Sequence, residues 1–138
     1  MPETATTDYL MGEGMRWFGP DDPVPLHFIR QAGAKEIFTS LHQIPYGEPW
    51  PRNAIGERKA LIESAGLRWT AVESVPIHEG IKTGRGDLKS LFKNYSHSLW
   101  SLAIEGIHTV IYNFMFCLHE FLALLNTSLF PIHNNILI

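Results

Sequence analysis

The chain has 138 residues, a net charge of −3 and 45% hydrophobic residues, the size and composition of one globular domain. This charge, with no cluster of Lys and Arg, argues against nucleic-acid binding. The single cysteine, Cys117, excludes an intrachain disulfide framework and fits a reducing compartment. Residues 1–14 are polar and do not resemble a secretory signal, so we expect a disordered N-terminal extension.

Apolar periodicity and turn residues predict alternating strands and helices along the chain. In chain order these are a strand at 15–18, a helix at 24–32, a strand at 36–41, a helix at 54–64, a strand at 67–75, a helix at 88–105 and a strand at 108–114. Each helix is expected to begin at an Asp or Asn cap and to end at a glycine. The caps are Asp21 or Asp22, Asn53 and Asp87, and the glycines are Gly33, Gly66 and Gly106.

This order predicts the α/β class and half of a (β/α)8 TIM-type barrel, with four strands and three helices. A whole barrel takes about 250 residues in eight units. The alternative is a complete small doubly wound sheet, but the first strand-to-helix turn lacks a glycine-rich phosphate cradle. Long loops at 42–51 and 76–86 both follow strands, as in barrels. The last helix carries an apolar stripe typical of a helix that lies on a sheet. Its members are Leu88, Leu91, Phe92, Tyr95, Leu99 and Leu102.

Three polar residues stand at predicted strand ends, where parallel α/β folds keep their chemistry: His42, Glu73 and Asn113. His42 is a candidate to hydrogen-bond a substrate hydroxyl or carboxylate, or else a loop histidine satisfied locally. A carboxylate at Glu73 is costly unless it is paired or solvated, so we expect a substrate contact or a structural salt bridge. Asn113 has the same placement and the same two interpretations.

The loop at 76–86, which is rich in glycine, and the first strand add further candidates. His78 lies on this loop, and Lys82 or Arg85 is placed to meet an anionic substrate. Trp17, at the first strand's end, is expected either to wall the site or to belong to the core. Nothing in the spacing of His42, Glu73 and His78 is specific for a metal, so no metal ligand is predicted among them.

Residues 116–138 differ in character, with no Lys or Arg and one carboxylate, Glu120. Leu118, Phe121, Leu122 and Leu125 fit one helical stripe, but Asn126 and Pro131 interrupt the pattern. The segment is too interrupted to span a bilayer, so no membrane association is predicted. It is either a final helix that docks on the core or a tail that was never selected for this fold.

Five separated blocks are similar to the N-terminal part of mannonate dehydratase. They are RWFGPDDPV (16–24), IRQAGA (29–34), LHQIPYGEPW (41–50), VESVPIHEGIK (72–82) and YNFM (112–115). The resemblance covers about residues 15–115 and implies a TIM-type barrel that uses Mn²⁺ or Fe²⁺. The implied reaction removes water from D-mannonate to give 2-dehydro-3-deoxy-D-gluconate, in cytoplasmic hexuronate breakdown.

The resemblance also implies what this chain lacks. The family's metal ligands and principal catalytic residues come from later strands, so the ligands are expected to be absent and the catalytic residues stay unassigned. Trp17, His42, Glu73, His78, Lys82 and Asn113 remain as substrate-binding candidates. From about Phe116 the resemblance stops, so we expect a truncated or frameshifted product, or a misassembled gene model, without activity of its own. The alternatives are a half-barrel fragment that self-associates as a homo-oligomer, or a related sugar isomerase.

Overall fold

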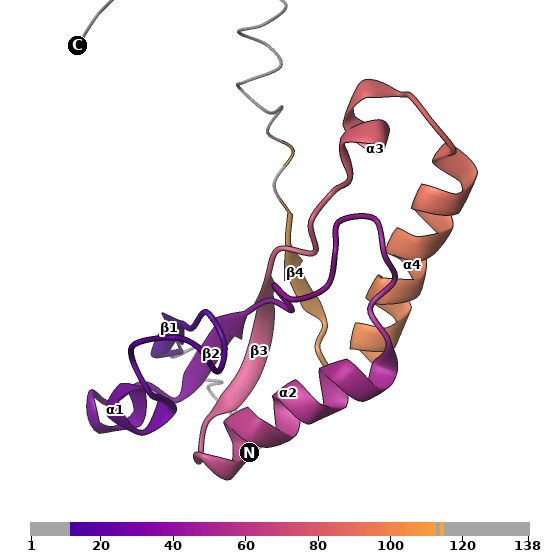
Figure 1. The fold of residues 1–138 in the computed structure, drawn as a ribbon. Coiled ribbons are helices and arrows are strands. Elements are labelled where there is room, and N and C mark those ends of the chain that lie inside the picture. Colours follow the sequence, from indigo (N-terminus) through magenta and orange to yellow (C-terminus); the bar gives the residue numbers. More distant parts are fainter. Residues whose placement is uncertain (1–11, 113, 115–138) are drawn as a thin grey trace, which may run out of the picture.

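The computed structural model describes residues 12–112 and 114, and it shows a parallel sheet with helices packed against it (Figure 1). The elements in chain order are β1 (Gly14–Arg16), α1 (Leu26–Gln31), β2 (Glu36–Thr39), α2 (Arg52–Ser64), β3 (Arg68–Glu73), α3 (Glu79–Thr83), α4 (Leu88–Ile104) and β4 (Thr109–Ile111). The predicted α/β class and the alternation of strands and helices are therefore confirmed. The sequence stripe at 118–125 and the candidate Asn113 lie outside the described residues.

The sheet has the order β1-β2-β3-β4, and every neighbouring pair is parallel. It begins one residue earlier than predicted, at Gly14. The carbonyl of Glu13 also accepts hydrogen bonds from the backbone of Lys35 and Glu36. The last residues of the segment 1–14 therefore belong to the sheet edge. A bulge lies in the pairing of β2 with β3, at Ile37 and Phe38.

Two predicted helix starts are wrong, and one is right. α2 begins before Asn53, because the carbonyl of Pro51 already accepts the backbone N–H groups of Ala54 and Ile55. Asp22 caps no helix; its carboxylate accepts from backbone N–H groups in the turn between β1 and α1. Asp87 does cap α4, where its side chain accepts from the N–H of Ser90.

The helix ends follow the predicted glycines. Gly33, Gly66 and Gly106 all have positive φ, between 76° and 99°. Glycine adopts this conformation without the steric cost that a Cβ brings. Each glycine therefore stops a helix and turns the chain toward the next strand.

The loop predicted at 76–86 contains a helix that the sequence analysis missed. α3 spans five residues, His78 caps it by accepting from the N–H of Gly80, and Gly84 ends it in the left-handed conformation. His is a weak capping signal in a sequence, and a five-residue helix is too short to show apolar periodicity. Among the described residues, no helix is long and apolar enough to cross a membrane.

One hydrophobic core joins the helices to one face of the sheet. Ile29 of α1, Ile62 of α2 and Leu102 of α4 are at most 1% exposed and belong to the same cluster as Ile37 of β2. Trp17 is part of this core at 3% exposure, the second of its two predicted placements. The helices therefore cover one face, and the other face carries both polar and apolar side chains, among them Arg16, Phe38 and Glu73.

Candidate functional site

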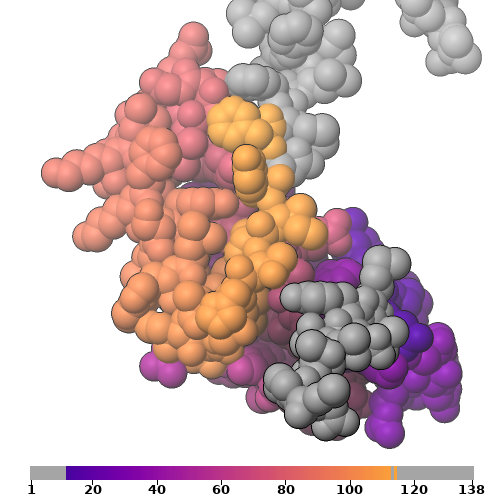
Figure 2. Space-filling view, turned by 180° about the vertical axis from the view of Figure 1, so that it is seen from behind, coloured from indigo at the N-terminus to yellow at the C-terminus, as the bar shows by residue number. Residues whose placement is uncertain are grey.

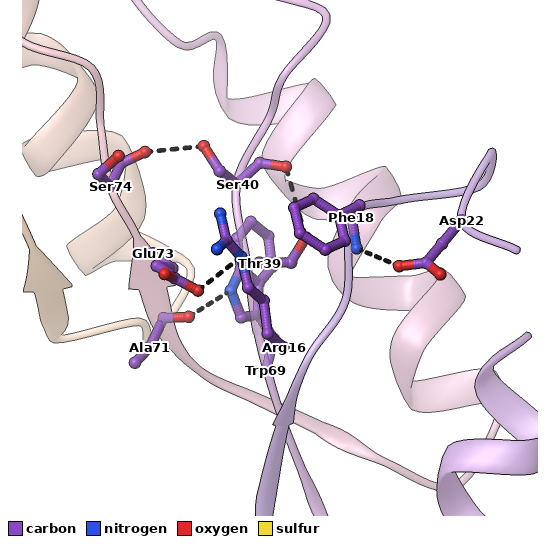
Figure 3. Close-up of polar contacts among 9 residues, drawn as sticks. All are labelled: Arg16, Phe18, Asp22, Thr39, Ser40, Trp69, Ala71, Glu73 and Ser74. Atoms are coloured by element: carbon purple, nitrogen blue, oxygen red, sulfur yellow. Dashed lines mark hydrogen bonds and ion pairs between the residues drawn. The ribbon is translucent and has the colours of Figure 1, made fainter. Parts of the chain in front are cut away.

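Four side chains meet at the carboxyl ends of the first three strands: Arg16, Phe18, His42 and Glu73, here called the strand-end cluster. Arg16 Nε lies 2.8 Å from Glu73 Oε2 (Figure 3). The Arg16 guanidinium also stacks over the ring of Phe18, at 4.3 Å from the centroid. The Phe18 and His42 rings lie 5.9 Å apart, centroid to centroid.

Strand register explains why Arg16 faces away from the helices. Arg16 pairs with Phe38 across β1 and β2, and parallel partners share a face of the sheet. Ile37, the neighbour of Phe38, is fully buried among the helices, so Phe38 and Arg16 point to the opposite face. From there the Arg16 side chain spans β2 to reach Glu73 on β3. The ion pair therefore ties together two strands that are not neighbours.

The strand ends are also joined by backbone-directed hydrogen bonds. The Ser40 hydroxyl donates to the carbonyl of Ser74 at 2.7 Å, just beyond the ends of β2 and β3 (Figure 3). Ser74 follows Glu73 directly and has φ 59°, an uncommon conformation for a residue with a Cβ. Such conformations persist where the surroundings hold them, and they concentrate at functional sites. The Ser40–Ser74 contact thus fixes the backbone that carries Glu73.

The turn after β1 holds Phe18 in place. The Asp22 carboxylate accepts from the N–H of Phe18 at 2.7 Å and from the N–H of Val24 at 2.8 Å (Figure 3). An aspartate that bridges two backbone N–H groups in this way closes a tight local turn. Phe18 is 55% exposed, so this turn presents an aromatic face beside His42 instead of burying it.

Arg58 of α2 supports the same region from the helix side. Its guanidinium donates to the carbonyl of Ser40 at 3.1 Å and to the side-chain oxygen of Gln43 at 3.4 Å. These two residues flank the segment that carries His42. Burial lowers the pKa of Arg58, and the charge of Asp21 opposes this shift. Arg58 stays protonated, because an arginine in a protein does not lose its proton near neutral pH.

The strand-end cluster offers complementary polar groups to a ligand. The side chains of Arg16 and Glu73 are 48% and 33% exposed, so both stay in reach of solvent while they are paired. His42 is exposed as well. A guanidinium is a planar donor suited to a carboxylate, and a carboxylate accepts from hydroxyl groups. The cluster is thus chemically suited to a molecule that carries both carboxylate and hydroxyl groups.

The structure brings His42 and Glu73 to one place, as the sequence analysis expected, and gives Glu73 its charge partner. Arg16 and Phe18 were not among the predicted site residues. Alternation along β1 was the available signal, because it puts Arg16 and Phe18 on the face opposite the buried Trp17. A charged residue on an uncovered face at a strand's carboxyl end is a candidate ligand contact. Trp17 itself packs in the core.

The remaining candidates are Lys82 in α3 and His78, the N-cap of that helix; Figure 1 shows α3 beyond the carboxyl end of β3 and apart from β1. The Lys82 ammonium contacts the Glu79 carboxylate at 2.6 Å, and its side chain is only 10% exposed. His78 caps its own helix and lines a cavity of about 10 Å³ together with Tyr46 and Tyr95. That volume suits about one water molecule and not a sugar acid. The substrate role of both residues stays a prediction.

The described residues do not fit a metal site. Among residues 12–112 and 114, no group of three or more His, Cys, Asp or Glu side chains is placed to hold an ion. Three or four such ligands are what Zn²⁺ and related divalent ions require.

Comparison with known proteins identifies the family of the chain. Residues 11–124 match the family model described as D-mannonate dehydratase (UxuA). The chain belongs to the D-mannonate dehydratase family. The match starts before residue 15 and runs beyond residue 115, so it is wider than the predicted resemblance and includes part of the segment 116–138.

Curated relatives agree with this membership. Over 100 residues the chain is 59% identical to the mannonate dehydratase of Chromohalobacter salexigens and 54% identical to that of Marinomonas sp.. These matches cover 72% of this chain and 26% of each relative, so the chain spans about a quarter of the length of these dehydratases. A crystal structure of mannonate dehydratase from Streptococcus suis serotype 2 superposes with a TM-score of 0.74 at 40% identity, over 77% of this chain and 31% of that one.

Proposed function

We propose that the strand-end cluster is the N-terminal side of the sugar-acid site of a D-mannonate dehydratase, a hydro-lyase of hexuronate breakdown in the cytoplasm. The reaction removes water from D-mannonate and gives 2-dehydro-3-deoxy-D-gluconate. The observation that carries the proposal is the Arg16–Glu73 pair, exposed at the carboxyl edge of the sheet in a chain of this family. Parallel α/β enzymes bind their substrates at that edge.

We propose a TIM-type barrel as the architecture to which this sheet belongs. The strand order β1-β2-β3-β4 follows the chain, as it does around a barrel, whereas a doubly wound sheet reverses its order at a switch point. The helices cover one face only, which in a barrel is the outer face. The strand-end cluster then lies at the mouth of the barrel.

The reaction sets the requirements for the site. The C2–H bond and the C3–O bond break. The proton leaves C2, the C3 hydroxyl takes up a proton and leaves as water, and the resulting enol becomes the 2-keto product. This needs a base, an acid and a group that holds the enediolate. We assign only binding roles to the described residues: Arg16 to the substrate carboxylate, and Glu73 and His42 to its hydroxyl groups.

The metal expected from the resemblance, Mn²⁺ or Fe²⁺, stays a prediction. Because the described residues do not fit a metal site, its ligands would lie outside them. We therefore expect the 138-residue chain, assayed alone with D-mannonate and Mn²⁺, to show no turnover above background. Robust turnover by the purified chain would contradict this assignment.

A chimeric enzyme tests the proposal directly. Residues 12–112 replace the matching segment of the Chromohalobacter salexigens mannonate dehydratase, to which the chain is 59% identical. We expect the chimera to convert D-mannonate, measured as the appearance of 2-dehydro-3-deoxy-D-gluconate. A folded chimera, judged by circular dichroism, that shows no such activity would count against the proposed substrate.

Within the chimera, the substitution Glu73→Gln isolates the strand-end cluster. We expect kcat/KM to fall roughly 10- to 100-fold, because a hydrogen bond to a charged group contributes about 1.5–3 kcal/mol. The control is Glu36→Gln, which removes a carboxylate paired with Arg68 at the other end of the same sheet, also at 2.8 Å. The control should keep kcat/KM within about twofold. Equal losses in both variants would place Glu73 outside the site.

A further inference from the structure

An apolar groove separates α4 from β4 in the part of the chain that the structure describes. Its cavity measures about 480 Å³. One wall is α4, with Phe92, Tyr95 and Leu99, and the other is formed by Val110, Tyr112 and Phe114. Figure 2 shows α4, in orange, beside the yellow-orange residues of this second wall. Ile77 and Ile81 complete the lining.

The groove leaves uncovered side chains that the sequence pattern predicts to be buried. Phe92 and Leu99 belong to the apolar stripe of α4, yet they are 53% and 37% exposed. On the opposite wall, Tyr112 is 65% exposed and Phe114 is 48% exposed. Leaving a large apolar side chain in water forgoes the free energy that burial would contribute. Apolar patches of this kind mark a surface that another element covers.

We propose that residues 118–125 of this chain cover the apolar groove as a helix. Leu118, Phe121, Leu122 and Leu125 have the i, i+3, i+4, i+7 spacing of one helical stripe. At 100° per residue, Glu120 and Ala123 would point away from that stripe, so in such a helix the only carboxylate of the segment would not meet the groove.

The path of the chain favours this occupant over a second copy of the protein. Phe114 lines the groove, and Leu118 follows only four residues later, within roughly 13 Å of extended chain. A tether this short gives an effective concentration in the millimolar range or above. Right-handed crossovers also return the chain after a parallel strand over the face that already carries the preceding helix.

The family match supplies an independent argument. It extends to residue 124 and so includes Leu118, Phe121 and Leu122. These residues therefore belong to the matched part of the chain. The segment 116–138 had two interpretations, a docked helix and an unrelated tail. For residues 116–124, the match favours the docked helix.

Hydrogen exchange on the full 138-residue chain, followed by mass spectrometry, tests the docking. We expect the amides of residues 118–125 to exchange at least tenfold more slowly than an unstructured peptide. Leu122→Asp should abolish that protection, because it places a charge in the apolar groove. Ala123→Asp, the matched control on the opposite side of the stripe, should retain it. The amides of β2 and β3 report whether each variant still folds.

A second pair of variants probes the groove itself. Leu99→Asp is expected to remove the protection of residues 118–125, whereas Ser96→Asp, exposed on the same helix, should preserve it. Exchange of residues 118–125 at the unstructured rate in the wild-type chain would overturn the proposal. So would equal protection in Leu122→Asp and Ala123→Asp. Protection that appears only with a dimeric mass in light scattering would assign the groove to a second copy instead.

Discussion

The α2 and α4 sides of the sheet are covered to very different degrees. On α2, Ile55 and Ile62 are fully buried against the sheet. On α4 the buried residues are Leu102 and two serines, whereas Phe92 of the predicted stripe is more than half exposed. Both helices have the apolar spacing of a helix on a sheet. The difference shows that spacing predicts which face of a helix is apolar, but not how much of that face its neighbours cover.

The two sides of the sheet are expected to contribute differently to stability and to the strand-end cluster. The well-covered side carries the backbone of β2 and β3, and hence the strand-end cluster. On the α4 side the helix has few buried residues, and it is joined to the loop after β2 by hydrogen bonds, from the N–H of Trp50 to the Ser98 hydroxyl and from the Asn94 amide to the carbonyl of Gly47. Substitutions on the first side should therefore cost more stability than substitutions on the second.

The largest expected effect is at the centre of the well-covered side. Ile62→Ala removes a fully buried side chain and should lower the free energy of unfolding by about 2–5 kcal/mol. Its neighbour Leu61 is 42% exposed, and Leu61→Ala should cost no more than about 1 kcal/mol. Urea denaturation followed by circular dichroism measures both. Similar midpoints for the two variants would contradict the assignment of α2's buried face.

The next effect concerns Arg58, which links α2 to the strand ends. Arg58→Met keeps the apolar stem but leaves the carbonyl of Ser40 without its donor, at a cost of about 1–3 kcal/mol. Arg52→Met, in the first turn of the same helix, removes an ion pair with Glu105 whose arginine side chain is 63% exposed, and it should cost less than about 1 kcal/mol. Faster amide exchange at residues 40–44 in the Arg58 variant alone would show that this residue positions the segment that carries His42. Unchanged exchange there would contradict that role.

Much of this architecture could be predicted from local sequence signals. Apolar alternation and the glycines at the helix ends predicted the strands and the three longer helices, and Asp87 was predicted as the α4 cap. The Arg16–Glu73 pair could not be predicted in the same way. It depends on two strands that are not neighbours, on their register and on the irregular pairing of β2 with β3, none of which a local pattern encodes.

The candidate site shows the same limit. His42 and Glu73 were found because strand ends are recognisable, whereas Arg16 was hidden next to Trp17 in a short apolar run. The helix α3 was missed because its cap is a histidine and its length is five residues. Sequence reasoning therefore located the edge of the sheet that carries the strand-end cluster, and the structure supplied the contacts across it.

The smallest expected effect tests the local interactions that hold α4. The Asp87 carboxylate accepts from the hydroxyl of Ser90 at 2.7 Å and from its N–H at 3.2 Å. These hydrogen bonds, the hydroxyl first, lower the pKa of Asp87 below its ordinary value of 3.8. Because the folded pKa is depressed, the ionised cap stabilises the protein fully above the unfolded pKa. That stabilisation is lost as the pH falls through the folded pKa.

Asp87→Ala should therefore lower the urea midpoint slightly at pH 7, and the difference from the wild type should shrink as the pH falls below 3.8. Asp87→Asn is the matched control, because asparagine caps a helix about as well but carries no charge. It should keep most of the stability at pH 7 while losing the pH-dependent part. A difference between wild type and Asp87→Ala that does not shrink as the pH is lowered would mean that the charge of Asp87 adds nothing to the hydrogen bonds of the cap.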